Sequence, residues 1–442
     1  MPFPRRFPSP LACTVAILIA WSGAPASLAL AQRSEPPGPG AAALFVNGSV
    51  LDLAALERAV LARNPSYAAM EAAIREAEAG ADREGSLEDP MVEFGVAPRS
   101  MGSSPVALGW RTSISQSLPL FGQRGLKRRA AQAGAEVARG DAEQLRLDLI
   151  RATRAAFFDD YHEERARANA LELLEWMRRS RSAALARYAA GTAEQQDVLA
   201  ADVEIAMLDH QAVRAERNRL LVEARIRALL HVDPLAPLPA PPDTLPLPGR
   251  DAARLLVMRS NERTRPEIRA AEAAVESQRA RLSLARRERL PGTRVWAGYD
   301  RTMMEPEYRF MVGLALEAPL SFGRHAAAGR EALAGLEGAT ARLEVARDAL
   351  SRRITEASTE FEESLHELEV VRDALLPAAE RASNAARARY EAGHGDFDTI
   401  IRALRDVSNA QLEYHRTLAS VNQAHAELER ALGGPQPQEP AR

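Results

Sequence analysis

Carboxylate and guanidinium side chains follow two glycine turns in this chain, and their spacing suits charge pairing rather than covalent chemistry. Asp398 and Arg402 are four residues apart, which places them on one face of a helix where they can form an ion pair. Asp396 stands where its carboxylate can cap the same helix. Asp197 is the carboxylate in the other stretch. These groups can pair within one helix or between copies of the chain, and the alternative is that they only cap helices.

Residue types that perform catalysis or bind metals are not arranged to do so. The sequence contains no HExxH, no Walker phosphate loop and no nucleophile elbow. Its eight histidines are scattered, and His415 and His425 stand ten residues apart on one expected helix, too far to share a metal. Met303 and Met304 are expected to fill a loop, although a thioether contact to a metal is conceivable there. We therefore expect no enzyme activity, no cofactor and no metal centre.

The N-terminus has the three parts of a cleavable secretory signal. Arg5 and Arg6 precede an apolar run over residues 11–30, so residues 1–31 are predicted to be a signal peptide that is removed on export. The alternative is an uncleaved membrane anchor. Cys13, the only cysteine, fits poorly as a site of lipidation because it precedes most of the apolar run. Without it the exported chain has no disulfide and no thiolate ligand.

The composition favours long helices. Ala, Arg, Glu and Leu dominate, and aromatic residues make up only 5% of the chain, which is typical of coiled coils. The formal net charge is −3, so the chain has no basic surface for nucleic acid. The alternation of acidic and basic residues along the expected helices is interpreted as a solvated face.

The chain contains one long pattern twice. Residues 51–230 recur as residues 251–432 with the same order of features, which predicts two repeats of one architecture rather than a solenoid of short units. We assign residues 32–230 to the first repeat, 231–250 to a Pro-rich linker, 251–432 to the second repeat and 433–442 to a disordered tail.

Each repeat has a hinge and a turn at matching positions. Glycine commonly ends a helix and a polar residue begins the next, so we expect each turn to reverse the chain, with Thr192 or Asp396 as the N-cap. The residues that define these features are Pro119, Gly122, Pro319 and Gly323 at the hinges, and Tyr188, Gly191, Tyr390 and Gly393 at the turns.

Two very long helices are predicted between the hinges and the turns. Residues 123–188 and 324–390 each contain about 66 residues, which corresponds to about 100 Å of helix. A kink is expected at Pro377 in the second. Apolar residues at heptad-like spacing predict the packed face of the first helix: Leu145, Ile150, Phe157, Tyr161, Leu171 and Leu174.

Shorter helices are expected to run back along the long ones. The return helices cover residues 192–230 and 396–432, and two further helices cover residues 266–290 and 65–87. Their lengths match a long helix when residues 192–230 are joined end to end with 266–290, and residues 396–432 with 65–87. A short apolar helix precedes Pro65 in one repeat, and residues 252–265 are the equivalent in the other.

Strand candidates lie beyond the hinges, near residues 91–118 and 292–317. Apolar residues alternate with small or polar ones from Leu108 to Ile114 and from Tyr308 to Leu316. Strands of about ten residues with one apolar face are typical of transmembrane β-barrels. A half-buried soluble hairpin is the alternative, but a hairpin at the far end of a helix of about 100 Å would have no core to cover it.

Four strands cannot close a barrel alone, because lipid offers no partners for the backbone groups of open edges. An eight-stranded barrel has a lumen filled by side chains, so a conducting barrel shared by several chains requires more than two. Three chains and twelve strands are the simplest solution.

With these features the chain resembles the TolC-like outer-membrane efflux proteins, also called outer membrane factors. The resemblance covers essentially the whole exported chain and depends on the order of the paired hinges, the paired turns, Asp197 to Ala200, Ile400 to Ile401 and the Asn64 to Pro65 helix start. The strand, hinge and helix of the first repeat look closer to the heavy-metal efflux subgroup than to the multidrug prototype. The chain departs from the family prototype at Thr399 and Arg402, where the prototype has acidic residues.

The resemblance implies a mainly α fold with a small β part, in which duplicated helical hairpins form a long periplasmic α-barrel joined to a transmembrane β-barrel shared by a homotrimer. It implies an outer-membrane channel that receives substrate from a periplasmic adaptor and an inner-membrane pump. The expected gate residues at the periplasmic turns are Tyr188, Gly191, Asp197, Tyr390, Gly393, Asp396, Asp398 and Arg402. For the tyrosines and charges, the alternative is a structural role as turn staples and helix caps. The alternative for the whole protein is a soluble periplasmic coiled-coil scaffold or adaptor.

Overall fold

A computed structural model of the chain describes residues 50–97, 109–191, 194–250, 265–303, 305–392 and 396–434. The expected signal peptide, Cys13, Thr192, Met304 and Gly393 lie outside the described residues. The same is true of all but one residue of the helix expected over 252–265, and of the tail beyond residue 434. None of the helices in the described ranges is long and apolar enough to cross a membrane.

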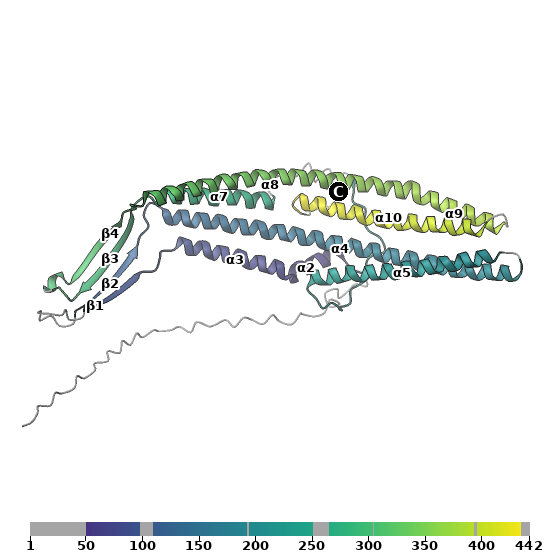
Figure 1. The fold of residues 1–442 in the computed structure, drawn as a ribbon, viewed down its shortest axis with the longest axis horizontal. Coiled ribbons are helices and arrows are strands. Elements are labelled where there is room, and N and C mark those ends of the chain that lie inside the picture. The colour runs from purple at the N-terminus through teal and green to yellow at the C-terminus, as the bar shows by residue number, and fades with distance from the viewer. Residues whose placement is uncertain are drawn as a thin grey trace, which may run out of the picture. The chain divides into compact units, whose positions relative to one another are not determined.

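The described residues of the first half form four helices and two strands (Figure 1). Asn64 and Pro65 start a helix because the Asn64 side chain accepts a hydrogen bond from the Ser66 N–H at 3.0 Å, and proline is tolerated in the first turn. The elements are α2 (Leu53–Arg63), α3 (Pro65–Gly85), β1 (Met91–Ala97), β2 (Gly109–Ser117), α4 (Gln123–Ala189) and α5 (Gln195–Leu230).

From α7 onward the second half repeats the order that begins at α3, with one short turn added between its strands and another within its long helix. The elements are α7 (Pro266–Arg287), β3 (Gly292–Asp300), the 3₁₀ turn η2 (Pro306–Tyr308), β4 (Phe310–Glu317), α8 (Phe322–Val370), the π-helical turn η3 (Val371–Leu375), α9 (Leu376–Glu391) and α10 (Phe397–Ala431). The α-helical pattern breaks just before Pro377, which cannot donate the backbone hydrogen bond that an α-helix requires. Tyr308, expected in a strand, lies in η2 instead.

The four strands form one antiparallel sheet in the order β1-β2-β3-β4. β2 pairs with β3, with Ile114 opposite Ala297, and this pairing joins the two hairpins into one sheet. The expected predominance of helix with a small antiparallel sheet is confirmed. β4 shows the alternation most clearly: Phe310, Val312, Leu314 and Leu316 are all more than 60% exposed.

The helices pack in four rows, as Figure 1 shows. α8 contacts α7 and α10, both of these contact α4, and α4 contacts α3 and α5 on its other side. The long α4 is therefore covered by return helices on both sides. α8 and the row of α3 and α5 form the two edges of the layer.

The expected end-to-end pairing of the return helices was wrong. The C-terminal end of α5 meets the start of α3, where the Asn64 side chain donates to the Leu229 carbonyl at 3.1 Å. The end of α10 meets the start of α7, where Arg430 lies 3.9 Å from Glu267. The partners are exchanged between the repeats relative to the prediction, because α3 and α7 have 21 and 22 residues and length alone cannot distinguish them.

The largest core cluster lies where α2, α4, α5, α8 and α10 meet the linker. Tyr161, Phe361 and Leu428 are fully buried there, and Leu245 of the linker packs into the same cluster. Of the predicted packed face of α4, Ile150, Phe157, Tyr161 and Leu174 are buried and Leu145 is partly buried. Leu171 is 38% exposed, so this part of the prediction was wrong, and the neighbouring Leu173 is buried in its place.

Candidate functional site

The two helical hairpins end in turns at one end of α4 and α9. Gly191 adopts the left-handed conformation with φ of 72°, and its N–H donates to the Tyr188 carbonyl at 2.9 Å. Only residues that tolerate positive φ close such a turn without strain. α5 then begins after Glu194, which has no side-chain capping bond, so the N-cap expected at Thr192 is displaced to Glu194.

The second return helix begins with the cap that the sequence predicts. Asp396 is the N-cap of α10, and its carboxylate accepts from the Asp398 N–H at 3.4 Å. Asp398 and Arg402 form the expected ion pair at 2.6 Å. Both side chains are more than half exposed, so the pair contributes little to stability within one chain.

The two turn tyrosines have different surroundings. Tyr188 is 45% exposed. The Tyr390 ring lies 5.9 Å from the ring of Phe397, and the Arg187 guanidinium lies 4.6 Å above its centroid. Because Arg187 belongs to α4 and Tyr390 to α9, this cation–π contact joins the two hairpins close to their turns.

The acidic residues of the two turns are also brought together. Burial raises the pKa of Asp197, and the negative charges of Asp396 and Glu194 raise it further, whereas Arg187 lowers it. Asp197 belongs to the first repeat and Asp396 to the second, so the fold concentrates negative charge where the hairpins meet. Nothing in the spacing of the sequence places these two carboxylates side by side.

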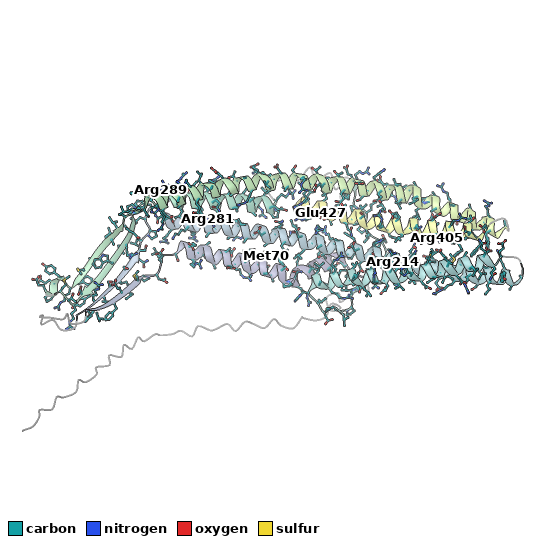
Figure 2. All side chains as sticks on the ribbon, in the orientation of Figure 1. Met70, Arg214, Arg281, Arg289, Arg405 and Glu427 are labelled. Atoms are coloured by element: carbon teal, nitrogen blue, oxygen red, sulfur yellow. The ribbon has the colours of Figure 1, made fainter. Side chains whose placement is uncertain are left out.

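An ion pair with a buried carboxylate, behind the turns, escaped the sequence analysis. Glu204 on α5 is only 4% exposed, and its carboxylate accepts from the Arg405 Nε of α10 at 3.2 Å (Arg405 is labelled in Figure 2). Around it the hairpins share a core that contains Leu174, Phe397 and Ile401. The pair and the core fix the two hairpins to each other, so a change in the turns has to break them or move both hairpins together.

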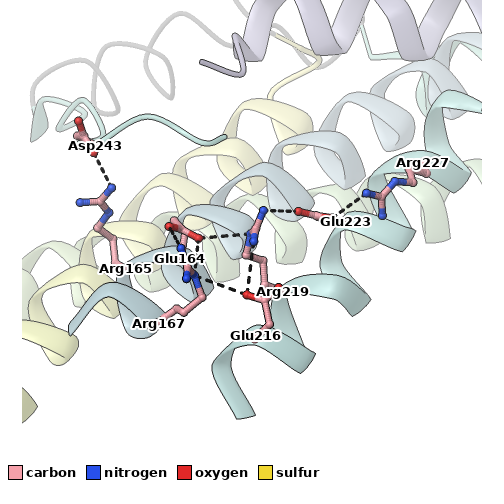
Figure 3. Close-up of polar contacts among 8 residues, drawn as sticks. All are labelled: Glu164, Arg165, Arg167, Glu216, Arg219, Glu223, Arg227 and Asp243. Atoms are coloured by element: carbon pink, nitrogen blue, oxygen red, sulfur yellow. Dashed lines mark hydrogen bonds and ion pairs between the residues drawn. The ribbon is translucent and has the colours of Figure 1, made fainter. Parts of the chain in front are cut away.

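A second cluster of charges lies where α4 and α5 meet the linker (Figure 3). Arg219 of α5 pairs with Glu164 of α4 at 3.3 Å and with Glu223 at 2.7 Å, while Arg165 of α4 reaches Asp243 of the linker at 2.6 Å. Glu223 is only 7% exposed. The interpretation of the alternating charges as a solvated face was therefore wrong for the charges of this cluster.

A buried carboxyl group and two partly buried histidines lie behind this cluster. Asp160 is 2% exposed and its Oδ1 has no hydrogen-bond partner among the described residues. His415, expected to be a packing or surface residue, is held at 2.7 Å from the Tyr161 hydroxyl, and the His425 ring lies 5.5 Å from that of Phe361. Both histidines serve packing, and within the described ranges no group of three or more His, Cys, Asp and Glu residues could hold a metal ion.

The hinges between sheet and helices are built differently in the two repeats. In the first, Phe121 and Gly122 both have positive φ, 62° and 70°, and Arg287 donates to the Phe121 carbonyl at 2.5 Å. In the second, α8 begins at Phe322, so Gly323 lies inside the helix and the residues after Pro319 make the bend. The hinge glycines are therefore not equivalent.

The sequence model of the family described as outer membrane efflux protein matches residues 56–231 and 259–434. The chain belongs to this family. The matched segments include both turns and both hinges, and they account for most of the chain.

Among curated relatives, this efflux protein is 25% identical over 326 residues to the cobalt-zinc-cadmium resistance protein CzcC of Cupriavidus metallidurans, with 73% of this chain and 77% of that protein covered. This relative agrees with the resemblance to the heavy-metal subgroup. The solved outer-membrane channel OprN superposes with a TM-score of 0.72 at 22% identity, covering 87% of this chain and 90% of that one.

VceC, an outer membrane protein of Vibrio cholerae, superposes on the efflux protein with a TM-score of 0.73 at 18% identity and covers 86% of this chain and 96% of that one. These likenesses show the fold. Family and fold together make the chain an efflux channel of the outer membrane that extends into the periplasm, and they do not favour a soluble scaffold.

Proposed function

We propose that three copies of this chain assemble into one passive duct across the outer membrane and the periplasm. The observation that carries the proposal is the single sheet, in which β1 and β4 are edge strands and the apolar face of β4 is exposed. Unpaired backbone groups are not tolerated in lipid, so each edge has to pair with the edge of another copy. Three copies supply twelve strands, whereas two would leave a lumen filled with side chains.

The helical layer supports the same assembly. Its two edges, α5 and α8, expose large apolar side chains that a single chain leaves in water. Because the two edges are different surfaces, the contact between copies is head-to-tail and closes into a ring. The exposed residues are Leu199, Val203, Met207, Val213, Leu220 and Leu221 on α5, and Leu333, Val345 and Val370 on α8.

In this assembly the hairpin turns form the periplasmic aperture. Each residue there is repeated three times, so a single charge becomes a ring that controls passage. We assign to the aperture the residues that the sequence predicts there: Tyr188, Gly191, Asp197, Tyr390, Gly393, Asp396, Asp398 and Arg402. The turns also provide the surface that a periplasmic adaptor contacts, and the adaptor connects the duct to an inner-membrane pump.

Native mass spectrometry in a mild detergent tests the proposal. We expect three protomers, together with ion conductance when the purified protein is added to a planar bilayer. A stable monomer without conductance would contradict the duct. Release of the protein by osmotic shock without detergent would instead favour the soluble scaffold.

A further inference from the structure

The two faces of the sheet differ in composition, and one tryptophan departs from the pattern. The register places Val295 and Val312 on the apolar face, whereas Trp296 and its cross-strand neighbour Gly313 lie on the opposite face. The other aromatic residues of the described strand segments lie on the apolar face: Phe94, Trp110, Tyr299 and Phe310. Trp296 is therefore the one aromatic residue of the described strand segments on a face where small and charged side chains predominate.

The indole of Trp296 packs against the backbone of the sheet. A Cβ atom at Gly313 would lie 2.6 Å from Cε2 and Nε1 of Trp296, so the ring rests directly on the backbone of β4. A Cβ atom at Gly298 would lie 3.6 Å from its Cζ3, and Ser115 is the neighbour across β2. Because these neighbours are glycines and a serine, one side of the ring packs against the sheet, while the side chain as a whole is only partly buried.

Charged residues flank the indole on the same face. Arg111 pairs with Glu93 at 3.1 Å across β1 and β2. The charged residues of this face are Glu93, Arg111, Arg294, Asp300 and Glu317. Three carboxylates against two guanidinium groups leave an excess of one negative charge in each chain, which favours cations over anions at this face.

We propose that Trp296 is a binding platform for planar aromatic cations inside the β-barrel. The inference rests on the proposed function, because closure of the barrel turns the polar face toward the lumen. An indole attracts cations to its π face and stacks on planar rings, and the contact with Gly313 holds the ring against the barrel wall, so that a planar cation bound on it occupies part of the lumen. Three copies place three such platforms at one level of the lumen.

Block of single-channel current by ethidium, a planar aromatic cation, tests this inference. We expect Trp296→Ala to raise the half-blocking concentration about tenfold, and Trp296→Phe to raise it less, because phenylalanine retains a smaller π face. Tetraethylammonium, a cation without a ring system, should distinguish the variants much less. Trp110→Ala is the matched control because Trp110 lies on the apolar face, and its block should equal that of the wild type.

A second measurement covers the case in which Trp296→Ala does not assemble. In a variant with Trp110→Phe and Trp176→Phe, fluorescence of Trp296 should be quenched by ethidium over the concentration range that blocks the current. Equal block of wild type and Trp296→Ala, or no quenching, would overturn the platform while conductance upholds the duct. Absence of conductance in the wild type would overturn the duct and the platform with it.

Discussion

Asp160 is a carboxyl group buried between α4 and α5. Its pKa is raised to about 7, first by burial and then by the negative charge of Glu223, while Arg219 acts in the opposite direction. Glu164 of α4 also raises it and Arg227 of α5 lowers it. In the unfolded chain the group titrates near 3.8, so between about pH 4 and pH 7 the folded state holds the proton more tightly. The free energy of unfolding therefore falls as pH rises through this window.

We predict that Asp160→Asn removes this dependence. Above pH 7 the wild type holds a buried, partly unpaired charge, and the variant should be more stable by about 2 to 4 kcal/mol. Near pH 4 the difference should vanish because Asp160 is then protonated. Thermal denaturation of the detergent-solubilised protein at a series of pH values measures it, with Glu172→Gln on the exposed side of α4 as the control. An equal melting temperature of wild type and Asp160→Asn above pH 7 would contradict the prediction.

His415 acts in the opposite direction over part of the same range. Its pKa is lowered to about 4, first by burial and then by the positive charges of Arg165 and His162. Between about pH 4 and pH 6.5 His415 is protonated in the unfolded state and neutral in the folded state. Its contribution to the free energy of unfolding therefore rises with pH through this window. In the wild type the two pH dependences of the free energy of unfolding therefore partly cancel. Only variants in which Asp160 or His415 alone is replaced separate the two contributions.

Asp398 and Arg402 are the residues whose role at the aperture is directly measurable. Within one helix their pair contributes only about 0.2 to 0.5 kcal/mol, so removing it leaves the fold intact. If these charges hold neighbouring copies together at the turns, Asp398→Ala and Arg402→Ala should each raise the resting conductance in planar bilayers. Asp396→Ala is an informative comparison, because loss of this N-cap should destabilise the turn by about 0.5 to 2 kcal/mol whatever its part in gating. Unchanged currents in both Asp398→Ala and Arg402→Ala would leave them as helix-surface charges.

At this scale the sequence predicts contacts within an element and misses contacts between elements. The Asp398 and Arg402 pair follows from their spacing on one helix, and the Asp396 cap from its place before α10. The contact of Arg187 with Tyr390 joins residues of different repeats. Such a contact depends on how the hairpins pack, which no local pattern contains.

Among the elements, proline and glycine mark helix ends well but do not decide which helices meet. Pro65 and Pro266 begin α3 and α7, and Gly191 lies in the turn between α4 and α5, as the sequence indicates. The junctions of α5 with α3 and of α10 with α7 depend on single contacts such as that of Asn64 with Leu229. Two short helices of nearly equal length satisfy the length argument equally well, and side-chain fit at the junction decides between them.

On the strands, the same substitution can be compared on the two faces of the sheet. Val312 and Met311 are neighbours on β4 that point to opposite faces. Val312→Arg on the apolar face should cost about 2 to 4 kcal/mol near the middle of the membrane and impair assembly. Ile114→Arg on β2 should behave in the same way.

Met311→Arg is the matched control, because it introduces the same side chain on the polar face. Heat-modifiable migration of the folded barrel and the yield in the outer membrane provide the readout. Equal yields of Val312→Arg, Ile114→Arg and Met311→Arg would show that the apolar face does not meet lipid.

For the molecule as a whole, the proposed assembly depends on the two edges of the helical layer. α4 is covered on both sides, whereas α8 and α5 are each covered on one. Val213 on α5 is 68% exposed and Val345 on α8 is 66% exposed. Exposed apolar side chains along an edge helix are expected of a surface that another copy covers. A contact between different edges repeats around a ring until it closes, so every copy contributes both edges.

We therefore predict that a charge on either edge weakens the same contact. Val213→Asp and Val345→Asp should each shift the native mass from three protomers toward one, because a carboxylate would be buried against an apolar surface without a partner. Leu235→Asp is the control, since Leu235 is 89% exposed but belongs to the linker and not to an edge helix. If only one of the two edge variants dissociates, the edges do not face each other. If neither does, the barrel strands alone hold the assembly together, and the long helices are then free to separate at the turns when an adaptor binds.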